Sequence, residues 1–430
     1  MKKDKSIIPS PLALAIVLSF VVYIFALLYT SSGNKGVFYP LQLLLYYQKG
    51  IWDLLTFAMQ MMLILVLGNV LALTPLFQRL LKSILTIIHN NTQAVVFTAL
   101  FSILLSYFNW GLGLIFSALL ARSIGEMARQ KQIEINYPLV VAAAYTGMMV
   151  WHGGLSGSAP LKVAQDGHFL ENLIGVIPVS KTIFSTMNIS LFVIFLLLLP
   201  STYYLLAKKY SKRITKPEEL PKAEVIAKAT TKHHYLGLSL GLALLIAAGY
   251  QFVLHGLAAL NINMINLILL GLGFVLYANL EQFMNAVNKA IVSSSGIMIQ
   301  FPIYAGIMGL LNYSGLIAIF TEHLVSISSP QTFPLYSFIS AAVVNFFVPS
   351  GGGQWAVQGP ILVDAAQQLG VSIPKTIMAL AYGDQLTNMI QPFWALPLLS
   401  ISGVKAKSIL PYTFIVMLVG AIASVVVLMW

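Results

Sequence analysis

Residues 343–363 read VVNFFVPSGGGQWAVQGPILV, an apolar stretch in which a proline, a serine and three consecutive glycines stand together. In a helix interior a glycine costs about 1 kcal/mol and a proline about 3 kcal/mol. A segment that is apolar enough for a membrane is therefore predicted to break at residues 349–353. A break at this position has to serve a function that offsets the loss of helix.

The rest of the chain has the composition of an integral membrane protein. Of its 430 residues, 58% are hydrophobic and 9% are charged, whereas about a quarter of the residues in soluble domains are charged. Long apolar runs at 12–28, 191–206, 236–254 and 412–430 each come close to the roughly 20 residues that a helix needs to cross a bilayer. We expect an all-α polytopic membrane protein without a separate soluble domain.

The basic charges orient the chain rather than bind nucleic acid. The net charge is +11, but the lysines and arginines stand in the gaps between apolar runs, where they follow the positive-inside rule. Lys2, Lys3 and Lys5 precede an apolar run that is too long for a cleaved signal peptide, so the N-terminus is predicted to be cytoplasmic. The absence of cysteine excludes disulfides and thiolate metal sites.

One long polar segment, 208–234, carries eight basic and three acidic side chains. It is predicted to be a cytoplasmic linker between a first half, 1–207, and a second half, 235–430. Identical residues recur in order in the two halves. The pairs Asn109/Asn345 and Pro138/Pro374 are each 236 positions apart, and Tyr145/Tyr382 and Pro160/Pro397 are each 237 apart. These four anchors indicate an internal repeat.

Each half is expected to contain a re-entrant hairpin, with tips at 109–113 and 349–353, and a broken transmembrane helix, at 138–161 and 374–399. An additional span near 235–254 inverts the second half relative to the first. With the N-terminus inside, all but five of the 24 lysines and arginines fall on the inner side, which supports nine crossings and two hairpins. The five outer residues are Lys35, Lys49, Lys162, Lys181 and Lys375.

Inverted repeats with interruptions at corresponding positions are typical of secondary transporters, whose ligands bind near the bilayer midplane. The glycines of 351–353 are predicted to unwind the tip, because glycine permits positive φ and irregular backbone is tolerated where it lines a cavity. Opposed helix N-termini then favour a small anion. The alternative is that the glycines only allow helices to pack closely.

The candidate substrate ligands lie at the two tips and just after them. They are Asn109, Gly111, Asn345, Ser350, Gly351, Gly352, Gly353, Gln354 and Trp355. Neither tip contains a lysine or arginine, so dipoles, hydroxyls and amides are expected to neutralise the anion.

Two ionisable residues are candidates for coupling to an ion. Asp384 is one of the few acidic residues away from segment ends, and His152 lies at the corresponding break of the first half. An ionisable group inside a membrane is a functional-site hypothesis by default. Both side chains can relay protons, and Asp384 can coordinate sodium with Thr387 and Asn388. A structural, hydrogen-bonded role is the alternative for both.

Residues 344–361, VNFFVPSGGGQWAVQGPI, resemble the signature of the bacterial short-chain fatty acid transporter family, whose members are similar in length and hydrophobic profile. The resemblance implies uptake of small monocarboxylates such as acetoacetate or butyrate across the inner membrane. It extends to Asn345, Pro349, Ser350, Gly351, Gly352, Gly353, Gln354 and Trp355 as motif positions. We expect Na⁺ or H⁺ as the coupling ion, no other cofactor, and membrane lipid and the small carboxylate as partners; a homodimer is left open.

Two other functions remain open from the residues. Gly154, Leu155, Ser156 and Gly157 match the G-x-S-G element of intramembrane serine proteases, with His255 as a distant base, although nucleophilic catalysis needs that base within hydrogen-bond reach. An anion channel is the second alternative, because hairpins also build selectivity filters.

Overall fold

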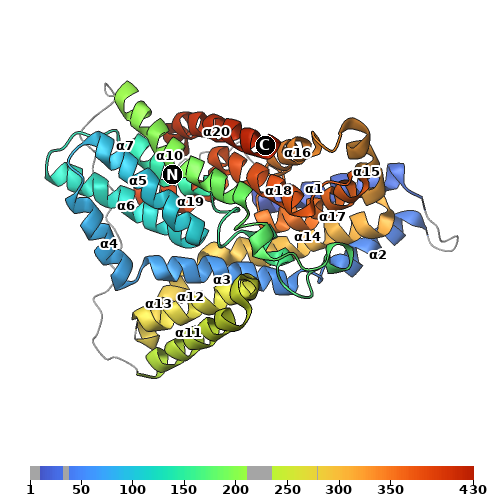
Figure 1. Ribbon diagram of the computed structural model, residues 1–430, viewed down its shortest axis with the longest axis horizontal. Helices are drawn as coiled ribbons and strands as arrows, with labels where there is room; N and C mark the ends of the chain where they lie inside the picture. Colours follow the sequence, from blue (N-terminus) through green and yellow to red (C-terminus); the bar gives the residue numbers. More distant parts are fainter. Residues whose placement is uncertain (1–9, 32–37, 211–234, 278) are drawn as a thin grey trace, which may run out of the picture.

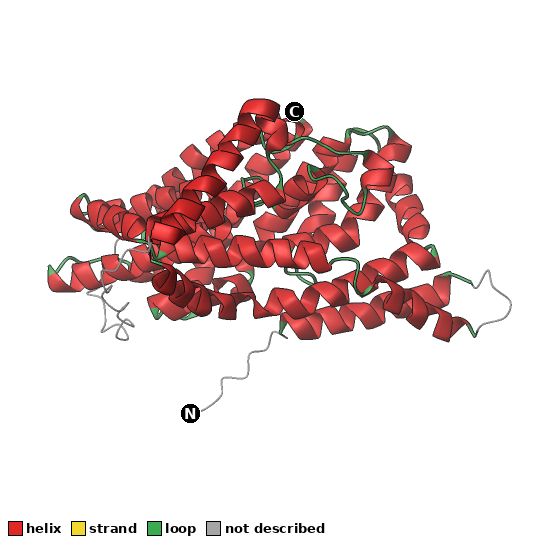
Figure 2. Cartoon of the chain, turned by 90° about the horizontal axis from the view of Figure 1, so that it is seen from below, coloured by secondary structure: helices red, strands yellow, loops and turns green. Residues whose placement is uncertain are grey.

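The computed structural model describes residues 10–31, 38–210, 235–277 and 279–430 (Figure 1). Within these ranges every regular element is a helix and none is a strand (Figure 2). Only residues 208–210 of the predicted linker are described. Lys2, Lys3, Lys5 and Lys35 also lie outside the described residues.

The first half consists of ten α-helices and two 3₁₀ turns in its described part. They are α1 (Pro11–Tyr29), α2 (Tyr39–Gly50), α3 (Leu55–Ala72), α4 (Pro75–Thr86), α5 (Asn91–Phe108), α6 (Trp110–Gln130), α7 (Tyr137–Ala144), η1 (Thr146–Met149), α8 (Ser158–Val163), α9 (Glu171–Ile174), η2 (Val179–Lys181) and α10 (Thr186–Lys209).

The described part of the second half is organised in the same way after an additional group of helices. Its elements are α11 (Tyr235–His255), η4 (Gly256–Ala259), α12 (Ile262–Tyr277), α13 (Leu280–Ala290), η5 (Ile291–Ser294), α14 (Ser295–Ser314), α15 (Leu316–Ile327), α16 (Phe333–Val344), α17 (Gly351–Leu369), α18 (Ile373–Thr387), η6 (Asn388–Ile390), α19 (Pro392–Ser402) and α20 (Ala406–Met429).

Each half contains a helical hairpin followed by an interrupted helix. The hairpins are α5–α6 and α16–α17, and the interrupted helices are α7–α8 and α18–α19. Pro138 and Pro374 each occupy the first turn of an interrupted helix, so this pair of repeat anchors falls on equivalent elements. The expected fold class, an all-α polytopic membrane protein, is confirmed; the position of each hairpin relative to the bilayer stays a prediction.

The region between the halves is larger than the sequence analysis expected. In place of one additional span, α11 packs against a second apolar helix, α12, and the amphipathic α13 follows. Figure 1 shows these three helices together on one side of α3. The hydropathy pattern does not predict α12 as a span, because its 16 residues fall short of the length that a bilayer-spanning helix requires.

Local sequence explains the main helix ends. Asn90, Asn109 and Ser350 each accept a hydrogen bond from a backbone N–H in the first turn of α5, α6 and α17, which are the positions where helices need side-chain acceptors. Gly315 and Gly370 end α14 and α17 in the left-handed region, with φ of 85° and 66°, where glycine has no steric penalty.

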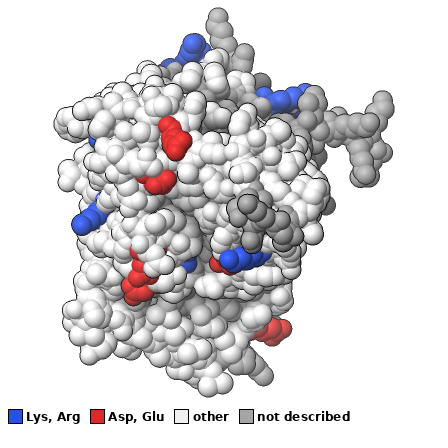
Figure 3. All heavy atoms as spheres, turned by 90° about the vertical axis from the view of Figure 1, so that its right-hand side faces the viewer, with Lys and Arg blue, Asp and Glu red and all other residues white. Residues whose placement is uncertain are grey.

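The distribution of apolar surface fits a membrane protein. Eight helices in the described part are long and apolar enough to cross a bilayer. Many large apolar side chains face outward, among them Phe20, Ile246 and Val253, with 64%, 71% and 82% of their surface exposed, whereas charged side chains are sparse on the face drawn in Figure 3. The polar residues described next are buried beneath this apolar exterior.

Candidate functional site

The tip of the first hairpin is a single residue. Asn109 separates α5 from α6; its Oδ1 accepts the Leu112 N–H at 2.9 Å, and its Nδ2 donates to the Ile64 carbonyl of α3 at 3.2 Å. The interruption predicted over 109–113 is present at Asn109 but does not extend to 113, because Gly111 lies inside α6. A Cβ on Gly111 would lie 2.9 Å from the Leu65 carbonyl oxygen, so this glycine lets α6 approach α3.

The tip of the second hairpin is longer and lies before the glycines. Residues 345–350 connect α16 to α17, and α17 begins at Gly351 with Ser350 as its cap. The glycines are therefore helical and none has positive φ, so the predicted unwinding at 351–353 is wrong. The reason is that the first N–H groups of a helix lack intrahelical acceptors in any case, and the Ser350 hydroxyl accepts one of them, from Gly353, at 3.3 Å.

The three glycines that begin α17 lie in close contact with neighbouring rings. A Cβ on Gly351 would lie 2.7 Å from both the Trp151 and His152 rings, and one on Gly352 would lie 3.0 Å from the rings of Phe57 and Phe301. A Cβ on Gly353 would meet the Tyr304 ring at a still shorter distance. The glycines thus have a packing role in the structure, and their role as ligands stays a prediction.

His152 and Asp384 form a buried pair between the two halves. The His152 Nδ1 and the Asp384 Oδ2 are 2.6 Å apart, and neither residue is exposed. On the other side of the ring, Nε2 accepts the Ala159 N–H at 3.2 Å and lies 3.0 Å from the Ser158 hydroxyl. Because Nε2 accepts, the ring proton resides on Nδ1 and is donated to the carboxylate.

Ser158, His152 and Asp384 are hydrogen-bonded in the same order as the three residues of a hydrolase triad. Their surroundings, however, do not fit a catalytic triad. The Nε2 lone pair that would take the serine proton is shared with the Ala159 N–H, and all three side chains are fully buried. The predicted protease pair is also absent. Ser156 is buried and accepts the Trp110 N–H at 2.9 Å, while His255 is exposed at the end of α11.

Residues of the second half also supply hydrogen-bond partners for the backbone of the first break. The Gln385 Oε1 accepts the His152 N–H at 3.0 Å and the Gly153 N–H at 3.3 Å. Asn188 of α10 donates to the Gly153 carbonyl at 2.8 Å and accepts the Tyr382 hydroxyl at 3.0 Å. The first break is therefore held from both halves.

The second break is organised around Asn345. Its Nδ2 lies 2.8 Å from the Asp384 carbonyl, 2.9 Å from the Thr387 hydroxyl and 3.0 Å from the Asn388 Oδ1. The predicted ion-coupling residues therefore separate into two groups. Asp384 directs its carboxylate to His152, whereas Thr387 and Asn388 are engaged by Asn345, a residue that the sequence analysis had assigned to the substrate.

Several buried oxygens of the second half have no hydrogen-bond partner among the described residues. They are Asp384 Oδ1, Asn345 Oδ1, Gln354 Oε1 and Gln391 Oε1. Carboxylate and amide oxygens are ligands for hard cations. In the described part of the chain, His, Asp and Glu do not gather in groups of three that could hold a metal ion, so any cation here would depend on amide, hydroxyl and backbone oxygens together with Asp384.

Tryptophans join the two tips, a feature that the sequence analysis missed for the first half. The Trp110 ring, directly after the first tip, lies 5.9 Å from the Trp151 ring by centroids, and Trp151 contacts the Gly351 position. The indole N–H groups of Trp110, Trp151 and Trp355 are buried without a partner in the described residues. An acceptor such as a carboxylate is what such donors require.

Together, these elements define a class of protein: a helical membrane protein built from two repeats, each with a hairpin and an interrupted helix around a buried polar centre, as in secondary transporters. The chain belongs to the short-chain fatty acid transporter family. The family model described as "Short chain fatty acid transporter" matches residues 2–430, so the chain is a member of a transporter family and not an enzyme.

Relatives and solved structures agree with this assignment. A protein of Escherichia coli K12 is 35% identical over 430 residues, covering 97% of this chain and 95% of the relative. One of Haemophilus influenzae is 36% identical over 423 residues, covering 94% and 92%. Both carry the provisional name short-chain fatty acid transporter.

Two solved structures share the fold at low sequence identity. The YdaH transporter of Alcanivorax borkumensis is 16% identical, with a TM-score of 0.63 and 98% of both chains covered. MtrF of Neisseria gonorrhoeae, described as illuminating a class of antimetabolite efflux pumps, is 13% identical, with a TM-score of 0.57 and coverage of 99% and 95%. These likenesses concern the fold alone.

Proposed function

We propose that this protein is a secondary active transporter that carries short-chain monocarboxylates, such as acetoacetate or butyrate, across the bacterial inner membrane with its N-terminus in the cytoplasm. Transport proceeds by alternating access and is driven by a cation gradient. Family membership supports the substrate class. The observation that carries the coupling mechanism is the buried pair of His152 and Asp384.

The carboxylate of the substrate binds between the two tips. The donors available there are the unpartnered indole N–H groups of Trp110 and Trp151 and the first backbone N–H groups of α17, which starts at Gly351. A helix N-terminus carries partial positive charge and favours an anion. The neighbouring aromatic rings of Phe57 and Phe301 provide an apolar wall for a short acyl chain.

The pair of His152 and Asp384 couples this binding to an ion. One partner belongs to the break of the first half and the other to α18 of the second. Moving the halves apart would separate a buried carboxylate from the one side-chain donor that it has among the described residues. Leaving a buried charge uncompensated is strongly unfavourable. A proton or a cation bound at the free Asp384 Oδ1 offsets that penalty, so the movement and the ion are linked.

Uptake into proteoliposomes tests the proposal. Purified protein should accumulate labelled butyrate or acetoacetate when either a proton or a sodium gradient is imposed, and applying the two gradients separately identifies the ion. An excess of unlabelled substrate inside should drive counterflow of the labelled one. Uptake that ignores both gradients, or flux without counterflow, would contradict a coupled carrier and favour the anion channel.

A further inference from the structure

Lys162 is a buried cation that the central site does not use. It lies in α8, directly after the first break, and only 5% of its surface is exposed. Its Nζ donates to the Gln60 Oε1 at 3.4 Å and the Gln165 Oε1 at 3.3 Å, and it lies 5.2 Å from the Phe57 ring centroid. In the described part of the chain, no carboxylate lies within 4.0 Å of this ammonium group.

Such an environment is incomplete for a charged lysine. An ammonium group has three N–H donors, and the two amide oxygens here lie at the long end of hydrogen-bond distances. Buried charges in proteins are paired with an opposite charge, because an unpaired one loses its hydration without compensation. Lys162 therefore lacks the anionic partner that a buried ammonium group needs.

A chain of amides connects this lysine to the surface. The Gln60 Nε2 donates to the Gln165 Oε1 at 3.0 Å and to the Oδ1 of the exposed Asn263 at 2.7 Å. Asn266 donates to the Gln60 carbonyl at 3.0 Å, and its Oδ1 is buried without a partner in the described residues. The polar side chains thus run from α12 to α8.

Gln60, Asn263 and Asn266 form the polar end of an open groove of about 510 Å³ between α3 and α12, which is also lined by Leu55, Thr56, Met59 and Leu63. Lys162 and Gln165 lie behind Gln60 and do not line the groove themselves. The remaining wall of the groove is largely apolar, with Leu55, Met59 and Leu63. A polar end backed by a buried cation, together with an apolar wall, matches a carboxylate that carries a short acyl chain.

We propose that Lys162, with Gln60 and Gln165, forms a second binding site for a short-chain monocarboxylate, separate from the site between the hairpin tips. The inference rests on the proposed function for its substrate class. The Phe57 ring lies between the two sites, because one of its contacts is with Lys162 and another is with the Gly352 position. A carboxylate held at Lys162 is thus one aromatic ring away from the start of α17.

Equilibrium binding of labelled butyrate to the purified protein tests this site. The unaltered protein should bind two butyrate molecules per chain, and Lys162→Met, which keeps the length of the side chain and removes its charge, should bind one. If Lys162→Met fails to fold, Lys162→Gln is the second variant, because it also removes the charge while its amide can still bond to Gln60. A single butyrate site in the unaltered protein, or two in either variant, would overturn the proposal.

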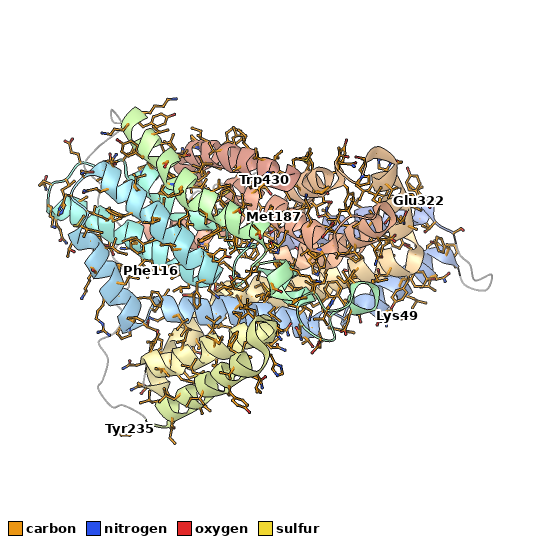
Figure 4. The ribbon with its side chains drawn as sticks, viewed as in Figure 1. Lys49, Phe116, Met187, Tyr235, Glu322 and Trp430 are labelled. Atoms are coloured by element: carbon orange, nitrogen blue, oxygen red, sulfur yellow. The ribbon has the colours of Figure 1, made fainter. Side chains whose placement is uncertain are left out.

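The matched control is Lys49→Met. Lys49 is exposed on α2 (Figure 4) and also covers an aromatic ring, that of Tyr313, at 3.9 Å. It should leave two butyrate sites. If labelled palmitate binds in a way that depends on Lys162 and labelled butyrate does not, the occupant is a long-chain lipid acid and the short-chain assignment fails.

Uptake measured in parallel separates this inference from the proposed function. If butyrate uptake is normal and the protein binds one butyrate that does not depend on Lys162, only the proposal of a second site is rejected. Absent uptake with a binding site that Lys162→Met removes rejects only the transport function.

Discussion

The two helix breaks occupy equivalent positions in the repeat but differ in which buried polar groups they leave without a hydrogen-bond partner. At the first break, both ring nitrogens of His152 are engaged, and the backbone N–H groups of His152 and Gly153 are accepted by Gln385. At the second, Asn345, Asp384 and Gln391 each keep a buried oxygen without a partner in the described residues. Among the described residues, the first break retains an unpartnered donor, the Trp151 indole N–H, whereas the second retains unpartnered acceptors.

This difference assigns different tasks to equivalent elements. Buried polar groups without partners are rare in folded proteins, and each one calls for an explanation such as an ion or a ligand. Oxygens that remain unpaired beside Asp384 are suited to a cation or a proton. On the proposed function, we expect the second half to hold the coupling ion and the first half to support it.

The largest effect is expected for Asp384→Asn, which removes the charge from the second break and retains the shape. Concentrative uptake should fall at least about 100-fold, to the equilibrium level, because an amide cannot take up the coupling charge at this position. Exchange of labelled for unlabelled substrate without a gradient should persist, since the contacts at the hairpin tips remain. Uptake and exchange in the same proteoliposomes measure both quantities.

Asp364→Asn is the control for this experiment. Asp364 lies on α17 and bonds to Gln368 at 3.4 Å, away from both breaks, so its variant should transport normally. Accumulation by Asp384→Asn equal to that of the unaltered protein would show that the pair of His152 and Asp384 is structural and that the two breaks do not differ in task.

A smaller effect is expected from alanine at the three glycines that begin α17, and the order of the three stability losses tests the packing role. Close packing predicts the greatest loss of thermal stability for Gly353→Ala, then Gly351→Ala, and the least for Gly352→Ala, following the distances to neighbouring rings. Thermal unfolding in detergent gives the order. Gly249→Ala is the control, because nothing lies near its Cβ position, and alanine in a helix is favoured by about 1 kcal/mol over glycine.

Transport by the same variants distinguishes packing from ligand binding. If Gly352→Ala is the most stable of the three and yet has the lowest uptake, a role beyond packing is required at that position. Uptake that follows stability across the series leaves the glycines with a packing role alone.

The smallest effects concern the caps of the two hairpins. Asn109→Ala removes a cap and a bond to α3 and should destabilise by about 2 kcal/mol, whereas Ser350→Ala removes one long bond and should cost about 1 kcal/mol or less. The order of KM for butyrate should be the reverse, because Ser350 precedes the first N–H groups of α17, which we propose to bind the carboxylate. A KM raised more by Asn109→Ala than by Ser350→Ala would contradict the division between the halves.

Much of the fold was predictable because its signals are local. Proline, glycine and asparagine mark helix ends within a few residues, so the hairpins, the interrupted helices and the repeat anchors could be placed from the sequence. The glycines of α17 show the limit of such rules. The cost of glycine applies to a helix interior, while these residues form a capped first turn whose contacts with Trp151 and Tyr304 come from distant segments.

The candidate site was predictable as residues and not as an arrangement. His152 and Asp384 stand out as rare ionisable groups in apolar segments, but their contact joins positions 232 residues apart. Nothing local indicates that Thr387 bonds to Asn345 instead of assisting the carboxylate. Lys162 was assigned to the outer side by the charge rule, and only the packing of α8 against α3 and α12 reveals that it is buried.

The hydrogen bond between Gln385 and the first break has a consequence for synthesis and membrane insertion of the protein. The ribosome completes His152 long before Gln385, which follows 233 positions later. At about 5–20 residues per second, the interval is on the order of 10 to 50 s. During this time the His152 and Gly153 N–H groups and the His152 ring lack their acceptors on Gln385 and Asp384. The insertion machinery or water must hydrogen-bond to these groups until the second half is inserted.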